Sequence, residues 1–247
     1  MEEKEKEPAN RENSGRNPDG TFKSGISGNP LGRPKNTLKD YVRQKFMEMT
    51  EAEKEEFPGA EMAAYGDNYN GYLVKPEAEG KFPAVVMIHE WWGLNDNIKE
   101  MARSLAAEGY VVLAVDLYDG KVGKNSTEAG QLASKVRSNT QPAIQNMKSA
   151  VQYLKNQNNV DRNKIASMGW CFGGAMSLQL ALNEKLAATI IYYGSLETNA
   201  TKLSVIKWHV LGIFGEKDTS ITVESVKKFE AALNQLGIEN EIYVYPN

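Results

Sequence analysis

The chain has 247 residues, 41% of them apolar, which is enough to bury one main hydrophobic core and leave some tens of residues for an appendage. Its formal net charge of −3 gives no reason to expect a membrane or a nucleic acid as a partner, and no apolar run approaches the length of a membrane span. The single cysteine excludes an intrachain disulfide and a Cys/His zinc cluster, and the acidic N-terminus is unlike a secretory signal, so we expect a cytoplasmic protein without a metal.

The first 57 residues predict an appendage to the main domain. Residues 1–35 are rich in Gly, Pro, Asn and charged side chains and have few aliphatic ones to offset the entropy lost on ordering, so we expect a largely disordered arm. After Asn36 or Thr37, either of which can cap a helix, apolar residues recur at helical spacing, and Pro58 ends the helical pattern. They are Leu38, Val42, Phe46 and Met49. This pattern predicts an amphipathic helix that packs on the main domain or on a partner.

The arm also contains a short motif. Residues 17–35 resemble a short domain seen in phage and mobile-element proteins, and Gly32-Arg33-Pro34 is similar to arms that place an arginine in the minor groove of DNA. A solvated linker is the simpler interpretation, and nucleic acid is not the favoured partner. A fusion or assembly error that joins unrelated pieces is left open.

Residues 60–247 alternate between short apolar runs and amphipathic stretches, which is typical of strands and crossover helices in a mostly parallel sheet. Several runs are apolar on both faces, as expected for a sheet covered by helices on each side. The predicted strands are 71–74, 84–88, 111–115, 165–168, 189–193, 210–214 and 241–245. Apolar residues at a helical period predict helices around 98–105, 144–154 and 226–236. The pattern therefore predicts one α/β domain, a three-layer α/β/α sandwich.

The segment Gly169-Trp170-Cys171-Phe172-Gly173 follows an apolar strand and precedes a helix-forming stretch. It has the Gly-x-Cys-x-Gly pattern of a nucleophile elbow, with cysteine in place of serine. Glycines fit there because the turn is tight and the backbone strained. A lone cysteine is usually a small buried hydrophobe, but a thiol at a helix N-terminus meets N–H groups that favour the thiolate. We predict that Cys171 is a nucleophile.

Three motifs in this domain are specific in combination. They are Met87-Ile88-His89-Glu90-Trp91-Trp92-Gly93-Leu94-Asn95, the elbow around Cys171, and Gly212-Ile213-Phe214-Gly215-Glu216-Lys217-Asp218. Together they resemble the dienelactone hydrolase family of the α/β-hydrolase superfamily. Over residues 60–247 the resemblance implies an α/β-hydrolase fold, a small-molecule ester or lactone as substrate, carboxylic ester hydrolysis and no cofactor.

The resemblance also implies roles for individual residues. Cys171 would attack the carbonyl, Asp218 would orient a histidine, and Glu90 would interact with the thiol in the resting enzyme. Asp218 follows a strand at its carboxyl end, where α/β sheets carry functional groups. The competing interpretations are that Asp218 only shapes a turn and that Glu90 is an ordinary loop carboxylate.

An oxyanion hole needs backbone N–H groups aimed at the developing alkoxide. In this fold one donor is the residue after the nucleophile, here Phe172, and the other comes from the loop after an earlier strand, here Trp91. The adjacent Trp91 and Trp92 either wall the site or simply pack.

A cysteine, histidine and aspartate mechanism also needs an imidazole, which the resemblance places after the last strand. The sequence stops at Asn247, just before that position. His209 is expected at the opposite sheet edge, roughly 16 Å from Asp218, and His89 should face away from Glu90. A sequence that ends before its histidine is favoured over a natural chain without one, so we expect a domain incomplete at its C-terminus and weak or absent turnover.

Two function classes remain open. The leading one is a hydrolase that forms an acyl-thioester on Cys171. The alternative is a non-catalytic binding protein with a hydrolase-like fold and a DNA-contacting arm. Arg137 is a candidate partner for a substrate carboxylate, although the sequence does not place it.

Overall fold

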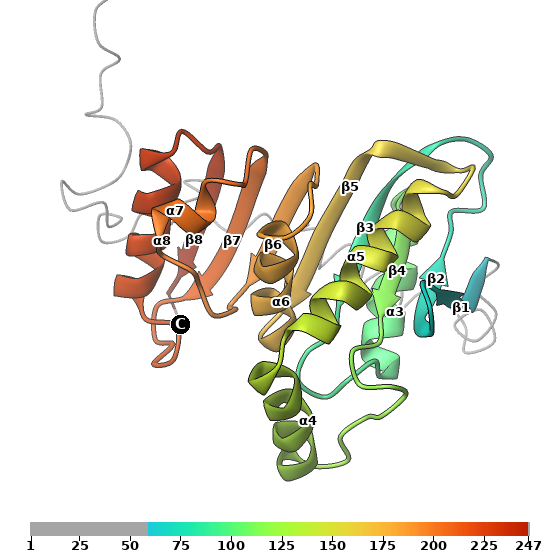
Figure 1. Cartoon of the computed structure of the whole chain (residues 1–247), viewed down its shortest axis with the longest axis horizontal. Helices are drawn as coiled ribbons and strands as arrows, with labels where there is room; N and C mark the ends of the chain where they lie inside the picture. Colours follow the sequence, from blue (N-terminus) through green and yellow to red (C-terminus); the bar gives the residue numbers. More distant parts are fainter. Residues whose placement is uncertain (1–58, 247) are drawn as a thin grey trace, which may run out of the picture. The chain divides into compact units, whose positions relative to one another are not determined.

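The computed structural model describes residues 59–246, in which eight strands form one sheet (Figure 1). The strands are β1 (Ala60–Tyr65), β2 (Tyr69–Val74), β3 (Phe82–Ile88), β4 (Val111–Val115), β5 (Val160–Trp170), β6 (Ala188–Tyr192), β7 (His209–Gly215) and β8 (Asn240–Tyr245). Their order across the sheet is β1-β2-β4-β3-β5-β6-β7-β8. β2 pairs antiparallel with β1 and β4, whereas all pairs from β4 to β8 are parallel. The predicted arm and amphipathic helix lie outside the described residues and stay predictions.

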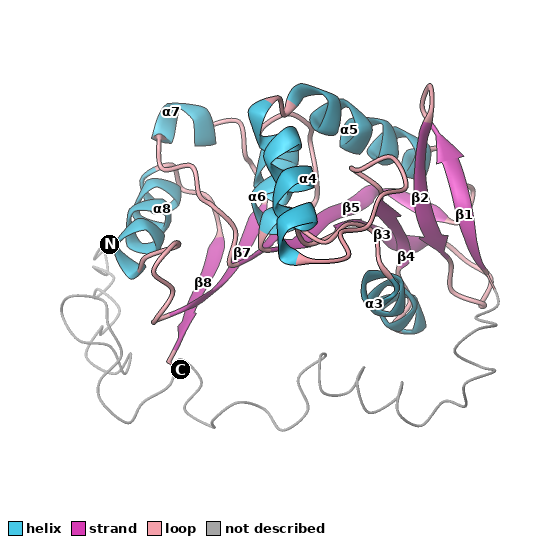
Figure 2. Ribbon diagram, turned by 90° about the horizontal axis from the view of Figure 1, so that it is seen from below, coloured by secondary structure: helices cyan, strands magenta, loops and turns pink. Residues whose placement is uncertain are grey.

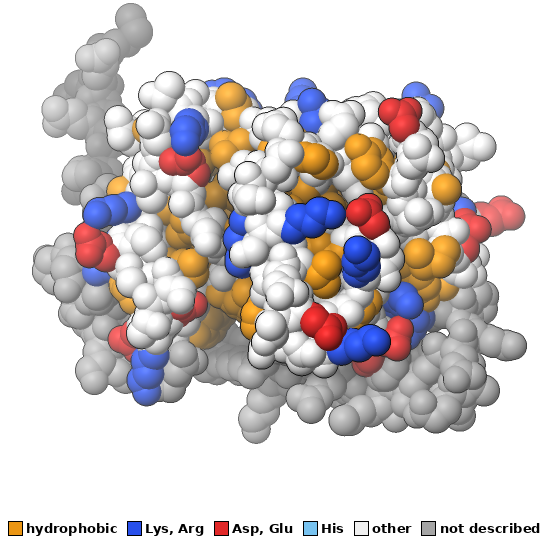
Figure 3. Space-filling view, turned by 60° about the horizontal axis from the view of Figure 1, so that its bottom comes forward, with side chains coloured by type: hydrophobic (Ala, Val, Ile, Leu, Met, Phe, Trp, Pro, Cys, Tyr) orange, Lys and Arg blue, Asp and Glu red, His pale blue; other side chains and the backbone are white. Residues whose placement is uncertain are grey.

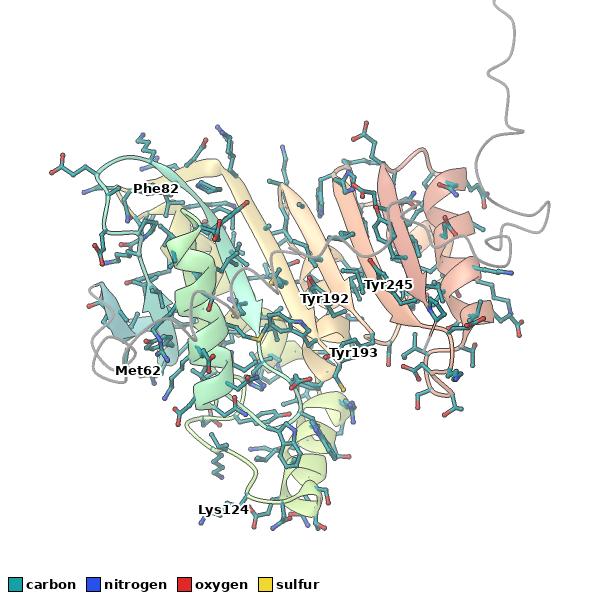
Figure 4. All side chains as sticks on the ribbon, turned by 180° about the vertical axis from the view of Figure 1, so that it is seen from behind. Met62, Phe82, Lys124, Tyr192, Tyr193 and Tyr245 are labelled. Atoms are coloured by element: carbon teal, nitrogen blue, oxygen red, sulfur yellow. The ribbon has the colours of Figure 1, made fainter. Side chains whose placement is uncertain are left out.

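Every predicted strand is present, and β1 is an additional one. The sequence of β1, Ala-Glu-Met-Ala-Ala-Tyr, lacks the β-branched residues that usually indicate a strand. It lies at the edge of the sheet, where Met62 is 59% exposed (Figure 4). Pairing with β2, rather than its own composition, therefore makes this segment a strand.

Helices lie on both faces of the sheet (Figure 2). They are α3 (Asp96–Ala107), α4 (Ser126–Ser138), α5 (Gln141–Lys155), α6 (Phe172–Ala181), α7 (Ala200–Leu203) and α8 (Val223–Gln235). α3 packs on one face, and α5, α6 and α8 pack on the other. This arrangement confirms the predicted three-layer sandwich.

Side-chain caps define where several helices begin. Asn95 accepts a hydrogen bond from the Ile98 N–H at the start of α3, and Asn125 accepts one from Glu128 at the start of α4. α4 was not predicted, because its buried residues are only Ala129 and Ala133 and leave little apolar pattern. The helix instead begins in a reciprocal cap, since the Glu128 carboxylate accepts in return from the Asn125 side-chain amide (3.0 Å).

The central strands are buried on both faces, and all five residues of β4 are buried. The parallel strands β3, β5, β6 and β7 place their carboxyl ends at one edge of the sheet, the lower edge in Figure 1. Loops at this edge hold the residues that the sequence singled out. In the part of the chain that the structure describes, no helix is both long and apolar enough to cross a membrane.

Candidate active site

Cys171 is the single residue between β5 and α6. Its backbone has φ of 54° and ψ of −115°, a left-handed conformation that costs energy for any residue with a side chain. Gly169 and Gly173 permit the turn, because an added Cβ on Gly169 would overlap the backbone of Gly173, and one on Gly173 would overlap the Ile88 carbonyl. The strand, tight turn and helix predicted around Cys171 are therefore present.

The thiol of Cys171 is half-buried, and burial raises its pKa. A hydrogen bond from the Phe172 N–H and the charge of Arg137 act in the opposite direction, whereas the carboxylates of Glu90 and Asp218 raise the pKa further. The N–H group at the helix N-terminus thus lowers the pKa of the thiol, as expected, but the opposite effect of desolvation is larger. The same balance shows that the structure brings Cys171, Glu90 and Asp218 into one electrostatic neighbourhood.

Glu90 follows β3, and its Oε1 accepts a hydrogen bond of 3.2 Å from the Tyr193 hydroxyl. Tyr193 follows β6 at the same edge of the sheet (Figure 4) and also has a left-handed backbone, with φ of 38°. Burial and the charge of Glu90 raise the pKa of Tyr193. Tyr193 was not predicted as a site residue, although its position directly after a parallel strand was an available signal.

Asp218 lies in the turn after β7. Its Oδ1 accepts hydrogen bonds from the N–H groups of Ser220 (2.8 Å) and Ile221 (2.9 Å), so the aspartate does shape the turn. Its charge still reaches the thiol of Cys171. The turn therefore fixes the carboxylate at the edge of the site.

Both histidines of the chain have partners other than the Cys171 thiol. His89 is fully buried, and its ring nitrogens bond to the Glu90 carbonyl and the Leu117 N–H. His209 begins β7, at the opposite end of that strand from Asp218, and pairs with Glu241 at 3.2 Å. The position of His209 agrees with the sequence-based expectation.

The loop after β3 is tied to neighbouring segments. Tyr118 donates from its hydroxyl to the Trp91 carbonyl (3.2 Å), and the Gly123 N–H donates to the Trp92 carbonyl (2.8 Å). The two indole rings contact each other, with centroids 5.0 Å apart. Trp91 also packs against the buried core, which supports the packing interpretation.

Arg137 is near the end of α4, and its guanidinium carbon lies 5.7 Å from the centroid of the Phe172 ring. Within residues 59–246 it forms no ion pair with an acidic side chain. Figure 3, in which the lower side of Figure 1 turns toward the viewer, shows hydrophobic patches between Lys and Arg side chains. A cation and an aromatic face therefore adjoin the elbow. No group of three His, Cys, Asp or Glu side chains in this part of the chain is arranged to hold a metal ion.

Comparison with known proteins assigns the family. The profile of the dienelactone hydrolase family matches residues 69–247. The protein named usf from Aquifex pyrophilus is 30% identical over 186 residues, which cover 73% of this chain and 80% of that protein. A Yersinia pestis protein with the provisional name carboxymethylenebutenolidase is 31% identical over 197 residues, or 73% of each chain.

Solved structures agree with this assignment. A dienelactone hydrolase-like promiscuous phosphotriesterase from metagenomic libraries superposes with a TM-score of 0.70 at 27% identity, covering 76% of this chain and 81% of that one. The structure called m3DLH superposes with a TM-score of 0.68, also at 27% identity. The chain therefore belongs to the dienelactone hydrolase family and has the α/β-hydrolase fold.

Proposed function

We propose that this protein hydrolyses a small carboxylic ester or lactone by way of an acyl-thioester on Cys171. The observation that carries the proposal is the strained, left-handed Cys171 at the junction of β5 and α6. Backbone strain of this kind persists where the surrounding structure imposes it, and it is concentrated at functional sites. Membership of the dienelactone hydrolase family supports a hydrolase.

In the proposed first step the sulfur of Cys171 attacks the ester carbonyl and a carbon–sulfur bond forms. The carbonyl electron pair moves onto oxygen, where the N–H groups of Phe172 and Trp91 would stabilise it. Collapse of this intermediate breaks the carbon–oxygen bond and releases the alcohol, which takes up a proton. Water then cleaves the thioester, which releases the acid and restores the thiol.

Glu90 is the proposed acceptor of the thiol proton. Its negative charge raises the pKa of Cys171, which keeps the resting sulfur protonated until a substrate changes the balance of charge. The hydrogen bond from Tyr193 holds the Glu90 carboxylate at this edge of the sheet. Glu90 and Tyr193 would thus act as one unit.

For a protein that consists of residues 1–247 alone, slow turnover is part of the proposal. Both ring nitrogens of His89 are occupied, and His209 lies at the far end of β7. Residues 1–247 therefore supply no imidazole to activate the water that cleaves the thioester. We expect acylation to outpace deacylation, so that the acyl-thioester accumulates.

Arg137 suggests the substrate class. An exposed guanidinium without an acidic partner among residues 59–246, next to an aromatic face and close enough to affect the thiol, suits an ester that carries a carboxylate. We expect Arg137→Gln to weaken binding of such an ester by about 10-fold without affecting a neutral ester of equal size. The matched control is Lys135→Gln, which removes a different exposed cation from the same helix.

The test of the reaction is a burst experiment with p-nitrophenyl acetate. The chain should release one p-nitrophenolate per protein rapidly and then continue slowly, because the acetyl group stays on sulfur. Cys171→Ala should show no burst, and His209→Asn should match the unmodified chain. A burst that survives in Cys171→Ala would rule out the proposed nucleophile.

A further inference from the structure

His89 lies between the segments that form the candidate site. It follows β3 and its side chain is fully buried. The imidazole stacks on Phe172, with centroids 5.8 Å apart at 17°, and meets Tyr118 edge-on at 4.6 Å. Phe172 directly follows the proposed nucleophile, and Tyr118 lies in the loop after β4. One ring at the end of β3 therefore contacts two further segments at the carboxyl edge of the sheet.

The hydrogen bonds of His89 define its protonation state. Its Nδ1 lies 2.6 Å from the Glu90 carbonyl oxygen, which can only accept, so Nδ1 carries the proton. The Leu117 N–H lies 3.2 Å from Nε2, so Nε2 is the acceptor. Only the neutral imidazole with its proton on Nδ1 satisfies both partners. In accord with this geometry, burial lowers the pKa of His89 to about 4.

The bond to the Glu90 carbonyl has a consequence for the next residue. The C=O of Glu90 and the N–H of Trp91 belong to one planar peptide unit and point in opposite directions, since no described peptide bond is cis. The carbonyl accepts a short bond from His89 (2.6 Å) and a longer one from the Gly93 N–H (3.3 Å), and fixing it fixes the direction of the Trp91 N–H. That N–H has no hydrogen-bond acceptor among residues 59–246.

We propose that His89 is a positioning residue that holds the Glu90–Trp91 peptide so that the Trp91 N–H can stabilise an oxyanion at Cys171. The imidazole anchors this peptide to the loop after β4 through the Leu117 N–H. The inference rests on the proposed acyl-thioester chemistry, to which it adds the group that aims the second oxyanion donor.

The experiment compares two reactions of the same sulfur. Acylation by p-nitrophenyl acetate passes through an oxyanion, whereas alkylation by iodoacetamide does not. Loss of one oxyanion donor slows acyl transfer by roughly 10²–10³, so a misdirected donor in His89→Leu should slow acylation by about 10- to 100-fold. Alkylation should change by less than about threefold, because it needs only the thiolate.

Conservative variants separate the two hydrogen bonds. The amide of Asn overlays the position of Nδ1, so His89→Asn can still donate to the Glu90 carbonyl, whereas His89→Gln reaches the Leu117 N–H instead. We expect His89→Asn to recover most of the acylation rate and His89→Gln to recover little. His209→Leu is the matched control, because it removes the chain's other imidazole at the far end of β7.

Each outcome decides the inference. A folded His89→Leu whose acylation and alkylation rates are unchanged, or fall equally, would overturn it. If that variant fails to fold, as judged by circular dichroism, the Asn and Gln variants replace it, and Gln acylating as fast as Asn would overturn the inference.

Failure of the proposed function is recognisable separately, because the unmodified chain would then not be acylated at Cys171. The position of the proton is then read from ¹⁵N NMR of the imidazole at neutral pH, with His209→Leu used to assign the signals. A proton on Nδ1 and an unprotonated Nε2 support the hydrogen bond from His89 to the Glu90 carbonyl, whereas the opposite tautomer overturns the inference.

Discussion

At the scale of single residues, the reactivity of Cys171 depends on opposing neighbours. Burial, Glu90 and Asp218 raise its pKa, whereas the Phe172 N–H and Arg137 lower it. Since only the thiolate attacks a carbonyl or an alkylating reagent, the fraction of thiolate at neutral pH follows from this balance. Substitution of one charged neighbour should shift that fraction in a known direction.

We therefore expect Glu90→Gln to lower the pKa of Cys171 and speed alkylation by iodoacetamide at pH 7 by roughly two- to tenfold. Arg137→Gln should raise the pKa and slow the same reaction. Rates measured across pH locate the pKa in each variant, and Lys135→Gln should leave it in place. A slower reaction in Glu90→Gln would show that the electrostatic account of the site is wrong.

His89 links the site to acid stability. Burial lowers its pKa from the ordinary 6.5 to about 4, so between these values the unfolded chain binds more protons than the folded one. The contribution of neutral, buried His89 to the free energy of unfolding is thus fully present above pH 6.5 and is lost as pH falls toward 4. We expect about 3 kcal/mol of unfolding free energy to disappear over this range.

Urea unfolding at pH 7 and at pH 4.5 measures this loss. His89→Gln should be less stable at pH 7 but lose less stability on acidification, because it has no imidazole to protonate. His209→Gln keeps His89 and should therefore still lose stability on acidification. An equal loss in the unmodified chain and in His89→Gln would assign the acid sensitivity to other groups.

At the scale of elements, the contact between α6 and β3 sets the geometry of the elbow. Gly173 of α6 lies against the carbonyls of Ile88 and His89, where a Cβ has no room, whereas the Gly130 position in α4 has only the Trp91 ring at 3.9 Å. Both glycines are inside helices, where alanine is intrinsically favoured by about 0.5–1 kcal/mol. Their surroundings therefore decide whether replacement by alanine raises or lowers the stability of the protein.

We expect Gly173→Ala to destabilise the protein by about 1–3 kcal/mol or more, because α6 must move away from β3. Gly130→Ala should stabilise it by up to about 1 kcal/mol. Urea denaturation of the two variants provides the comparison. Equal changes in the free energy of unfolding would mean that the close packing of α6 on the β3 carbonyls leaves room for a side chain at position 173.

The elements also show what sequence patterns can reveal. The buried parallel strands and the elbow were predictable, because runs such as Val111–Val115 are apolar on both faces and Gly-x-Cys-x-Gly follows a strand directly. β1 and α4 were missed because neither has a strong apolar period. The positions of Tyr193 and Arg137 near Cys171 could not be predicted from the sequence. They depend on the order of the strands across the sheet and on the path of α4, which no local pattern reveals.

At the scale of the whole described domain, the two faces of the sheet are covered unequally (Figure 2). α3 packs over β3 and β4, and within residues 59–246 no helix packs on the same face of β6 to β8. The strand register places Met168, Ile190 and Leu211 in one row on that face. Ile191 points to the opposite face and is fully buried.

Adjacent residues of β6 therefore test the difference between the two faces. We expect Ile191→Lys to unfold the domain, because it buries an unpaired charge under α6, whereas Ile190→Lys should cost only about 1 kcal/mol. Thermal unfolding of both variants measures the contrast. Equal destabilisation would show that the β6–β8 face is also covered in the intact chain.

Mass spectrometry of the intact chain after mixing with p-nitrophenyl acetate shows whether Cys171 is the nucleophile. We predict one added acetyl group, located by proteolysis on the peptide that contains Cys171 and removable by hydroxylamine as expected for a thioester. An unmodified Cys171, with the acetyl group absent or carried by another side chain, would contradict it.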